Sequence, residues 1–302
     1  MKIVIAGGTG FIGTYLANRY IQDGHDVIVI ARSKTKSMFT CVEWTDSQGV
    51  HAAINHADLL INMAGKSVDC RYNNANKKAI LESRVNTTRQ LNEVVAAVQY
   101  PPKLWVNSST ATIYRHAEDR PMTESDGDIG SGFSVDVATA WEKTFFSKNT
   151  DQTRKVALRT AIVLGHGGGA FKHFKMLTNI GFGGSQGSGK QMVSFVHIED
   201  VYRAIEFLRN HENLSGVFNV SAPNPITNQK FMKTFQTKLK KRLAIPIFTW
   251  MLAIGAFFLR TETELLLKSR WVLPERLQKH GFTFAFNDIN HVIQNLISTE
   301  VE

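Results

Sequence analysis

The stretch Gly7-Gly8-Thr9-Gly10-Phe11-Ile12-Gly13 decides the fold of this chain. It follows a mainly apolar run at residues 2–6, and it leads into residues 11–22, whose apolar side chains recur at helical spacing. A second apolar run, Asp26–Ala31, comes directly after that helix. The order of strand, glycine loop, helix and strand predicts a mononucleotide-binding unit at the start of a Rossmann-type sheet.

The glycines at positions 7, 10 and 13 of this loop have separate tasks. Glycine lets the chain turn tightly, lets the backbone approach a pyrophosphate, and lets the helix pack closely on the sheet. The helix that begins here offers unpaired N–H groups and the positive end of its dipole to an anion. We therefore expect a dinucleotide at this loop. The predicted contacts are Gly7, Thr9, Gly10, Phe11, Ile12 and Gly13.

The rest of the chain continues the alternation of strands and helices. The predicted strands are Cys41–Trp44, Leu59–Asn62, Lys103–Asn107 and Val156–Leu164, and the predicted long helices are Asn74–Val98 and Val135–Phe146. Short strands at Val193–Val196 and Val217–Val220 flank a predicted helix at Ile198–Arg209. From Thr227 onward the pattern is mostly helical. The expected fold class is α/β, with a Rossmann-type doubly wound parallel sheet and a smaller, mainly helical C-terminal substrate region.

This pattern also suggests a division into domains. We expect residues 1–165 to form the dinucleotide-binding Rossmann domain, with residues 190–220 returning to it. Residues 166–189 and 221–302 would form the smaller substrate-binding region. The glycine-rich loop Gly181–Gly189 belongs to that region and is a candidate lid, because glycines permit movement. Its plainer interpretation is a connector.

Composition excludes several classes of protein. The chain has 302 residues, of which 43% are hydrophobic and 20% charged, as in ordinary globular proteins. Its two cysteines, Cys41 and Cys70, form neither a CxxC pair nor a Cys/His cluster, which argues against a metal site and a secreted disulfide framework. The N-terminus has no signal-peptide pattern, so we expect a cytoplasmic protein.

The net charge of +9 indicates an anionic ligand. Apart from a cluster at residues 238–242, the basic residues are scattered, and no recognition motif supports nucleic-acid binding. The apolar run Leu243–Leu259 is short for a bilayer span, which needs about 20 residues, and Pro246 interrupts it. We expect it to be a buried helix or to line an apolar cleft, with membrane contact as the alternative.

The end of the second strand distinguishes two dinucleotides. Sites selective for NAD place an Asp or Glu there, where it binds the ribose 2′-hydroxyl. Here the strand ends in Ile30-Ala31-Arg32-Ser33, without a carboxylate. Arg32 can instead pair with a 2′-phosphate, and Lys34 and Lys36 add positive charge. We therefore expect NADP(H) as the cofactor, with contacts from Ala31 and Arg32.

Several motifs together resemble the epimerase-like, atypical branch of the NAD-dependent epimerase/dehydratase family, within the short-chain dehydrogenases/reductases. The matching pieces are the glycine loop, Asn62–Gly65, Ser108–Thr110, Glu82–Thr88, Trp141–Glu142, Leu158–Gly165, Val196–Asp200, Asn219–Pro223 and Pro274–Phe282. This resemblance implies that Met63 and Ala64, followed by Gly65, pass beside the adenosine and ribose. It also implies that Arg84 reaches the phosphates and that the backbone around Val163 meets the nicotinamide. From the residues alone, Arg84 is an ordinary helix arginine.

Ordinary members of that superfamily use a Tyr and a Lys four residues later as an acid/base pair. If Glu142 is the Glu that often follows the Lys, the two positions are Ser134 and Ala138, and no Tyr-x-x-x-Lys occurs in the chain. The resemblance retains a hydroxyl at Thr110. Tyr114 is the candidate for the missing proton donor, and its structural interpretation is a packed or loop tyrosine. His197, Asp136 and Glu142 are further candidates, and each of them also has an ordinary structural interpretation.

Two functions follow from this pattern. The first is an NADP-dependent oxidoreductase or epimerase-like enzyme that acts on an unidentified small molecule. The second is a non-catalytic NADP(H)-binding or sensing module that acts through a protein partner, which the missing Tyr/Lys pair favours. The resemblance also suggests a homodimer, paired through the helices near Asn74–Val98 and Val135–Phe146.

Overall fold

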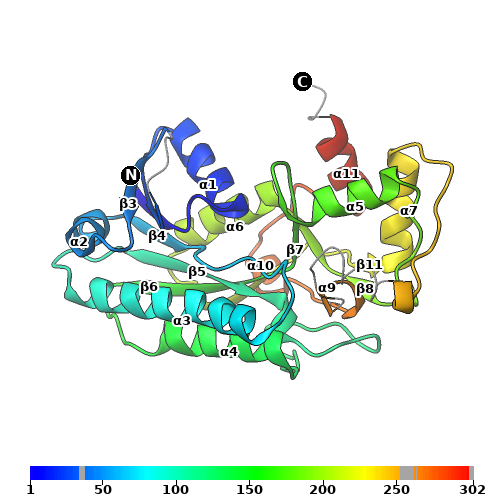
Figure 1. Cartoon of the computed structure of the whole chain (residues 1–302). Helices are drawn as coiled ribbons and strands as arrows, with labels where there is room; N and C mark the ends of the chain where they lie inside the picture. Colours follow the sequence, from blue (N-terminus) through cyan, green and yellow to red (C-terminus); the bar gives the residue numbers. More distant parts are fainter. Residues whose placement is uncertain (34–37, 252–261, 263, 299–302) are drawn as a thin grey trace.

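Seven parallel strands form the centre of the computed structural model, which describes residues 1–33, 38–251, 262 and 264–298 (Figure 1). Every neighbouring pair in this sheet is parallel. The order across the sheet is β10 (Gly216–Val220), β6 (Arg154–Thr160), β5 (Leu104–Thr110), β4 (Leu59–Asn62), β1 (Lys2–Ala6), β2 (Asp26–Ala31) and β3 (Thr40–Glu43). The predicted Rossmann-type sheet is thereby confirmed.

Helices cover both faces of the sheet (Figure 1). Because side chains alternate along a strand, Ile3 and Ile5 of β1 pack under α1 (Phe11–Gln22) and α6 (Ile198–Asn210). Val4 and Ala6 face the opposite way and join the core with α2 (Ser47–Ile54), α3 (Asn74–Ala97) and α4 (Phe133–Phe146). The sheet is therefore buried on both sides, as a parallel sheet must be.

A second core lies beyond the carboxyl ends of the strands. It contains four phenylalanines from α5 (Gly169–Asn179) and α7 (Asn228–Lys238), and the apolar face of α11 (Ile289–Ser298). Two small sheets accompany it: β7 (Ile162–Leu164) pairs with β9 (Phe195–His197), and β8 (Met192–Val193) pairs with β11 (Ile226–Thr227). Two short helices, α9 (Glu264–Leu267) and α10 (Glu275–Lys279), follow later in the chain, and α10 packs against β10 of the large sheet.

The prediction of one strand over Val156–Leu164 is wrong. The chain changes sheets within this run: β6 pairs with β5 and β10, whereas β7 pairs with β9. Ala161 lies at the change and donates its N–H to the carbonyl of Val220. The predicted strand Val193–Val196 is likewise divided between β8 and β9. Hydrophobic periodicity indicates which residues are buried. No residue in either half of these two runs is exposed, so the hydrophobic pattern does not show where the chain passes from one sheet to another.

Two helices escaped prediction. The short helix α2 contains Gly49 and begins at Asp46, whose carboxylate accepts the Gly49 N–H in a side-chain cap. The helix α5 begins inside the glycine run Gly167–Gly169, which the sequence pattern treats as a loop.

The segment Leu243–Leu259 also differs from expectation over its described part. Ile247 is buried, but Leu243, Phe248 and Trp250 are 59%, 55% and 65% exposed. Within residues 243–250 the expected buried helix is therefore wrong. Residues 252–259, like Lys34 and Lys36, lie outside the described residues. No helix in the described ranges is both long and apolar enough to cross a membrane.

Candidate functional site

The strand order changes direction between β1 and β4, since β2 lies on one side of β1 and β4 on the other. At such a switch point the loops after two neighbouring strands separate and leave a crevice. A cleft of about 480 Å³ opens here, bounded by the loops after β1, β4 and β5 and by α3 and α4. Its lining includes Gly7, Gly10, Phe11, Ile12, Gly13, Met63, Ala64, Gly65, Arg84, Tyr72, Thr110, Thr112, Phe133, Ser134, Ala138 and Trp141.

The floor of the cleft has no room for a side chain at Gly7 or Gly13. Gly7 has a φ of +77°, and a Cβ there would lie 2.7 Å from the backbone of Ala64. A Cβ on Gly13 would lie 2.3 Å from the carbonyl oxygen of Gly7. The loop is also fixed by its own hydrogen bonds, from the Gly10 N–H to the Gly7 carbonyl and from the Thr14 hydroxyl to the Gly8 carbonyl. A ligand here would meet backbone atoms directly.

The helix α1 begins at this floor without a side-chain cap. The first N–H groups of a helix have no intrahelical partner, and an anion satisfies them well. Gly10, at the N-cap position, lines the cleft, so these donors are directed towards it. The geometry fits the phosphates of a dinucleotide.

Arg84 supplies a cation from the α3 side of the cleft. One terminal nitrogen donates to the carbonyls of Lys66 and Ile80, each at 3.0 Å, and the guanidinium carbon lies 5.2 Å from the centre of the Trp141 ring. Burial lowers the pKa of Arg84 to about 10, so the group stays charged at neutral pH. Among the described residues no carboxylate pairs with it, and the charge is free for a ligand phosphate.

The other predicted cofactor residues lie around this cleft or apart from it. Thr9 is exposed at the tip of the loop, next to Gly10. Ala31 ends β2, and Arg32 follows it, exposed and without an ion pair among the described residues. The start of the glycine loop is tied to the same strand end, because the Gly7 N–H donates to the Ile30 carbonyl. Val163 lies in β7, outside the large sheet, and packs against the core under α1.

Thr110 ends β5 and lines the cleft. Its hydroxyl oxygen accepts the N–H of Thr112, which leaves the hydroxyl hydrogen available for a substrate oxygen. Ser134 and Ala138, one helical turn apart on α4, line the same cleft. Neither residue can supply the acid/base chemistry of a Tyr/Lys pair.

Tyr114 lies in the interior and is only 1% exposed. Its hydroxyl donates to the Asn219 side chain and accepts from Arg159, each at 2.9 Å. Arg159 also forms a two-fold contact with the carboxylate of Glu142, which accepts the Ser109 hydroxyl at 2.6 Å. Tyr114 and Glu142 therefore belong to one satisfied buried network beneath the cleft, and such a network fixes structure.

The remaining weaker candidates have structural surroundings too. His197 is 5% exposed, and its Nδ1 accepts the Glu199 N–H at the start of α6. Burial lowers the pKa of His197 to about 4, so the ring is neutral at physiological pH. Asp136 is exposed in the first turn of α4, where a carboxylate stabilises the helix dipole.

Tyr72 is a cleft residue that the sequence did not reveal. It lies just before α3, where its N–H donates to the Glu262 carboxylate at 2.6 Å and its ring meets that of Phe133 edge-on, with 5.0 Å between centroids. Its hydroxyl is hydrogen-bonded to that of Ser134, and burial raises the pKa of Tyr72. The Ser134 hydroxyl in turn donates to Glu264 at 3.1 Å. No local pattern joins positions 72, 134 and 264, and only the fold brings them together.

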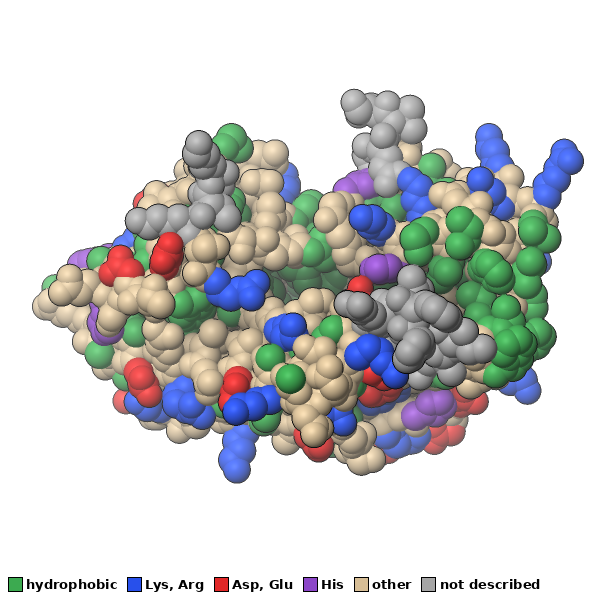
Figure 2. Space-filling view, viewed as in Figure 1, with side chains coloured by type: hydrophobic (Ala, Val, Ile, Leu, Met, Phe, Trp, Pro, Cys, Tyr) green, Lys and Arg blue, Asp and Glu red, His purple; other side chains and the backbone are tan. Residues whose placement is uncertain are grey.

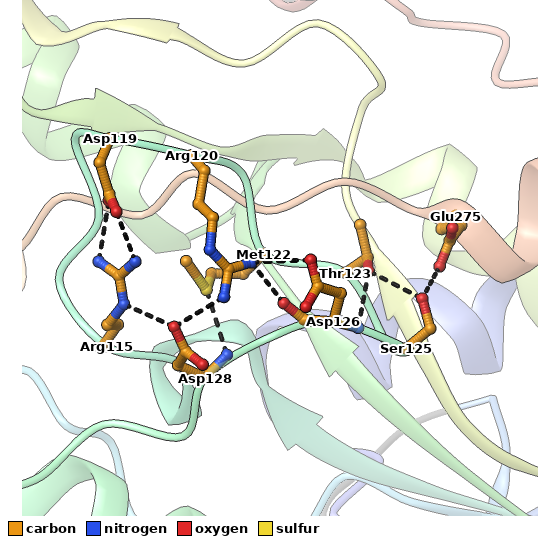
Figure 3. Close-up of polar contacts among 9 residues, drawn as sticks. All are labelled: Arg115, Asp119, Arg120, Met122, Thr123, Ser125, Asp126, Asp128 and Glu275. Carbon is orange, nitrogen blue, oxygen red and sulfur yellow. Dashed lines mark hydrogen bonds and ion pairs between the residues drawn. The ribbon is translucent and has the colours of Figure 1, made fainter.

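An exposed ion-pair network braces the loop between β5 and α4 (Figure 3). Arg115 holds Asp119 with two nitrogens and Asp128 with a third, and Arg120 pairs with Asp126 and Asp128. Further along, Ser125 donates to Glu275 of α10. The loop that leads to the Phe133–Ser134 wall of the cleft is thus fastened to the C-terminal part of the chain.

Comparison with known proteins gives the family. A model of the NAD dependent epimerase/dehydratase family matches residues 3–221. The chain belongs to this family. A second model, for a domain of unknown function (DUF1731), matches residues 247–296. The predicted resemblance to the epimerase/dehydratase family is confirmed.

Relatives in this epimerase/dehydratase family match over nearly the whole chain. The epimerase family protein YfhF of Bacillus subtilis is 30% identical over 308 residues, covering 99% of this chain and 98% of that protein. Human epimerase family protein SDR39U1 is 29% identical over 301 residues, covering 99% of this chain and 100% of that protein. A crystal structure of human SDR39U1 with NADPH matches with a TM-score of 0.89 and covers 99% of both chains.

More distant members share only the fold. The UDP-N-acetylglucosamine 4-epimerase from Bacillus cereus is 15% identical, with a TM-score of 0.77, and the match covers 99% of this chain and 96% of that one. At this identity the likeness shows the doubly wound architecture and says nothing of the substrate.

Proposed function

We propose that this protein is an NADP(H)-dependent oxidoreductase or epimerase-like enzyme that acts on the hydroxyl or carbonyl group of a small molecule. The observation that carries the proposal is one cleft that joins a glycine loop with no room for side chains at Gly7 and Gly13, a half-buried cation at Arg84 without a carboxylate partner among the described residues, and a free hydroxyl at Thr110. Such a cleft binds a dinucleotide at one end and leaves a polar group for a second ligand at the other.

Selection of NADP over NAD rests on Arg32. It is exposed immediately after β2, beside the start of the glycine loop, where a 2′-phosphate would lie. The NADPH bound to the human relative SDR39U1 supports this choice. Met63, Ala64 and Gly65 would contact the adenosine and ribose, and Arg84 the phosphates.

A bound NADP(H) would supply or accept the hydride in this reaction. The protein would then orient the substrate oxygen and move one proton. Thr110 would donate a hydrogen bond to that oxygen and polarise it.

We assign the proton step to Tyr72 rather than Tyr114. Tyr72 lines the same cleft as Thr110, whereas the Tyr114 hydroxyl is held by Arg159 and Asn219. The Tyr72 hydroxyl is protonated at neutral pH, so in the reductive direction it would give its proton to the carbonyl oxygen. Burial raises the pKa of Tyr72 and makes it a weaker acid than a free tyrosine, so its position in the cleft carries this assignment. Ser134 and Glu264 would hold it in place.

The first test is cofactor binding. Titration calorimetry with NADPH and NADH should show tight binding of NADPH, weak binding of NADH, and loss of the difference in Arg32→Ala. Equal binding of both by the wild type would overturn the assignment of Arg32. A screen of carbonyl compounds, followed through the absorbance of NADPH, then tests turnover.

The second function is a non-catalytic NADP(H) module that acts through a protein partner. It is favoured by Ser134 and Ala138, which occupy the cleft positions where an acid/base pair is expected. Steady oxidation of NADPH by a defined substrate would exclude it. No oxidation by any compound in the screen, together with tight binding of NADPH, would support it.

Three further expectations belong to this proposal. The smaller region, residues 166–189 and 221–302, would complete the substrate pocket. A homodimer would form through α3 and α4. A cytoplasmic location would suit the two cysteines, which are free thiols in the structure.

A further inference from the structure

Large apolar side chains gather on the surface at one end of the molecule. Ile180, Leu243, Ile245, Phe248 and Trp250 are between 39% and 65% exposed, and we call these five residues the apolar patch. Figure 2 shows green side chains concentrated at the right of the molecule, over the region of α7. With Met176 of α5, they make up six of the twelve large hydrophobic side chains exposed in the described residues. Such clustering marks a binding surface, whereas scattered exposed residues do not.

The apolar patch has a fixed backbone. The Ile245 N–H donates to the Gly181 carbonyl at 2.8 Å, and the Ile247 N–H donates to the Ser185 carbonyl at 2.9 Å. The Gly187 N–H donates to the Ile247 carbonyl, and the Ile247 side chain is buried. A Cβ on Gly184 would lie 2.5 Å from the nitrogen of Pro246, so the two segments touch through their backbones. The exposed side chains are therefore held outward by paired backbone.

The two stretches of sequence that supply the apolar patch carry only positive charge. The sequence has no Asp or Glu between Gln152 and Ile198, or between Asn213 and Thr261. These two stretches supply α5, α7 and the whole patch. Four cations directly precede it, Lys238, Lys240, Lys241 and Arg242, and among the described residues none of the four has an acidic partner.

We propose that the apolar patch and its neighbouring cations form a docking surface for an anionic lipid bilayer. Lipid headgroups would pair with the lysines and the arginine, and the aromatic and aliphatic side chains would enter the interfacial region. The contact is peripheral. This proposal does not depend on the chemistry of the cleft, because none of the five patch residues lines it.

Two other occupants fit less well. A second copy docking the same surface on itself would bring two unpaired basic clusters together, which costs electrostatic energy. A nucleic acid would match the cations, but it would leave Leu243, Ile245 and Ile180 against a polar phosphate backbone. A bilayer with anionic lipids offers negative charge and an apolar phase in adjoining layers.

Co-sedimentation of the full-length protein with vesicles tests the proposal. We expect binding to phosphatidylcholine vesicles that contain about 30% phosphatidylglycerol to exceed binding to pure phosphatidylcholine at least about 10-fold at low salt. The double variant Phe248→Ser/Trp250→Ser should lose about 10-fold in binding, and Lys240→Gln/Lys241→Gln should lose the preference for anionic lipid. Tyr100→Ser is the matched control, because it removes an aromatic ring that is 49% exposed in another part of the chain.

Each result decides for or against the bilayer. Titration with NADPH and a thermal melt for every variant show whether it is still folded. A folded variant that no longer binds vesicles has lost the docking surface alone. Absence of binding to the anionic vesicles at low salt would overturn the proposal. So would vesicle binding that Phe248→Ser/Trp250→Ser leaves unchanged, because the attraction would then be charge alone. A dimer that the same variant dissociates, without vesicle binding, would assign the surface to a second copy.

Discussion

The two ends of the cleft are built from different parts of the chain. The glycine-loop end consists mainly of backbone, because residues 7–13 and 63–65 follow two adjacent strands, β1 and β4. The other end consists of side chains that come from separate places, including Tyr72, Ser134 and Glu264. The backbone end is disturbed by even one added methyl group at Gly7 or Gly13. A side-chain site can be changed one residue at a time without disturbing the fold, and this explains how one fold serves many reactions.

A substitution in the glycine floor should have the largest effect. Gly7→Ala would place a Cβ 2.7 Å from the Ala64 backbone, at a φ of +77°. We expect NADPH affinity to fall by at least about 100-fold, or about 2.8 kcal/mol. Gly24→Ala is the matched control, since Gly24 has a φ of +79° but no atom within 4 Å of the added Cβ. If calorimetry showed equal losses for both, strain alone would explain the effect, and the backbone contact would not matter.

A substitution at the side-chain end should leave the cofactor bound. With a substrate found in the carbonyl screen, Tyr72→Phe is expected to lower turnover about 100-fold, the size of one general acid, without changing the affinity for NADPH. Tyr114→Phe should do the opposite. It would lower the free energy of unfolding by about 1–3 kcal/mol, because Arg159 and Asn219 lose a partner, and it would leave turnover per folded molecule near the wild type. The reverse outcome would restore Tyr114 as the proton donor.

Arg84 and Arg32 should differ in which dinucleotide they affect. Arg84→Met removes a charge that faces the phosphates common to both dinucleotides, so affinity for NADPH and NADH should fall together, by about 10-fold to 100-fold. Arg32→Ala should weaken NADPH alone. Titration of each variant with both dinucleotides separates the two roles. Selective loss of NADPH in Arg84→Met would mean that the 2′-phosphate lies on the α3 side.

The smallest effect is expected at Glu275, which accepts a hydrogen bond from Ser125 in the loop between β5 and α4. Lys279, then Ser125, hold the pKa of the Glu275 carboxyl at about 2, below its ordinary 4.5. A lowered pKa stabilises the folded state above pH 4.5, and this contribution disappears as the pH falls towards 2. Glu275→Gln should therefore be slightly less stable than the wild type at neutral pH and equal to it near pH 2. Because the group is exposed, urea midpoints that differ strongly would contradict this view.

The sequence predicted the local fold of the glycine-loop end well, for a physical reason. Its determinants, Gly7, Gly10 and Gly13, lie within one loop between a strand and a helix, so local pattern contains the whole signal. The strands β1, β2 and β4 were predicted with their observed bounds, since each is a short apolar run next to a turn.

The side-chain end was not predictable in the same way. Tyr72 and Glu262 are 190 residues apart, and they meet only because α3 and the C-terminal segment fold against the same wall. Tyr114 looked suitable because it follows β5, yet its side chain enters the core. The segment Leu243–Leu259 was expected to be a buried helix or to line an apolar cleft, yet Leu243, Phe248 and Trp250 are exposed. Hydropathy measures what a side chain prefers, and a binding surface departs from that preference.

The position of β1 in the sheet also sets an order of events during synthesis. This strand leaves the ribosome before the other strands of the sheet, but it lies in the interior of the sheet, and its two neighbours come from residues 26–30 and 59–62. Its backbone is therefore paired on both sides only after β4 has emerged. At the far edge of the sheet, β6 pairs on its second side only after β10, residues 216–220, has been synthesised. The strands that flank the glycine loop have thus all emerged by residue 62, whereas the sheet is complete only after residue 220. The glycine loop is therefore the first part of the cleft whose neighbouring strands are all present during synthesis.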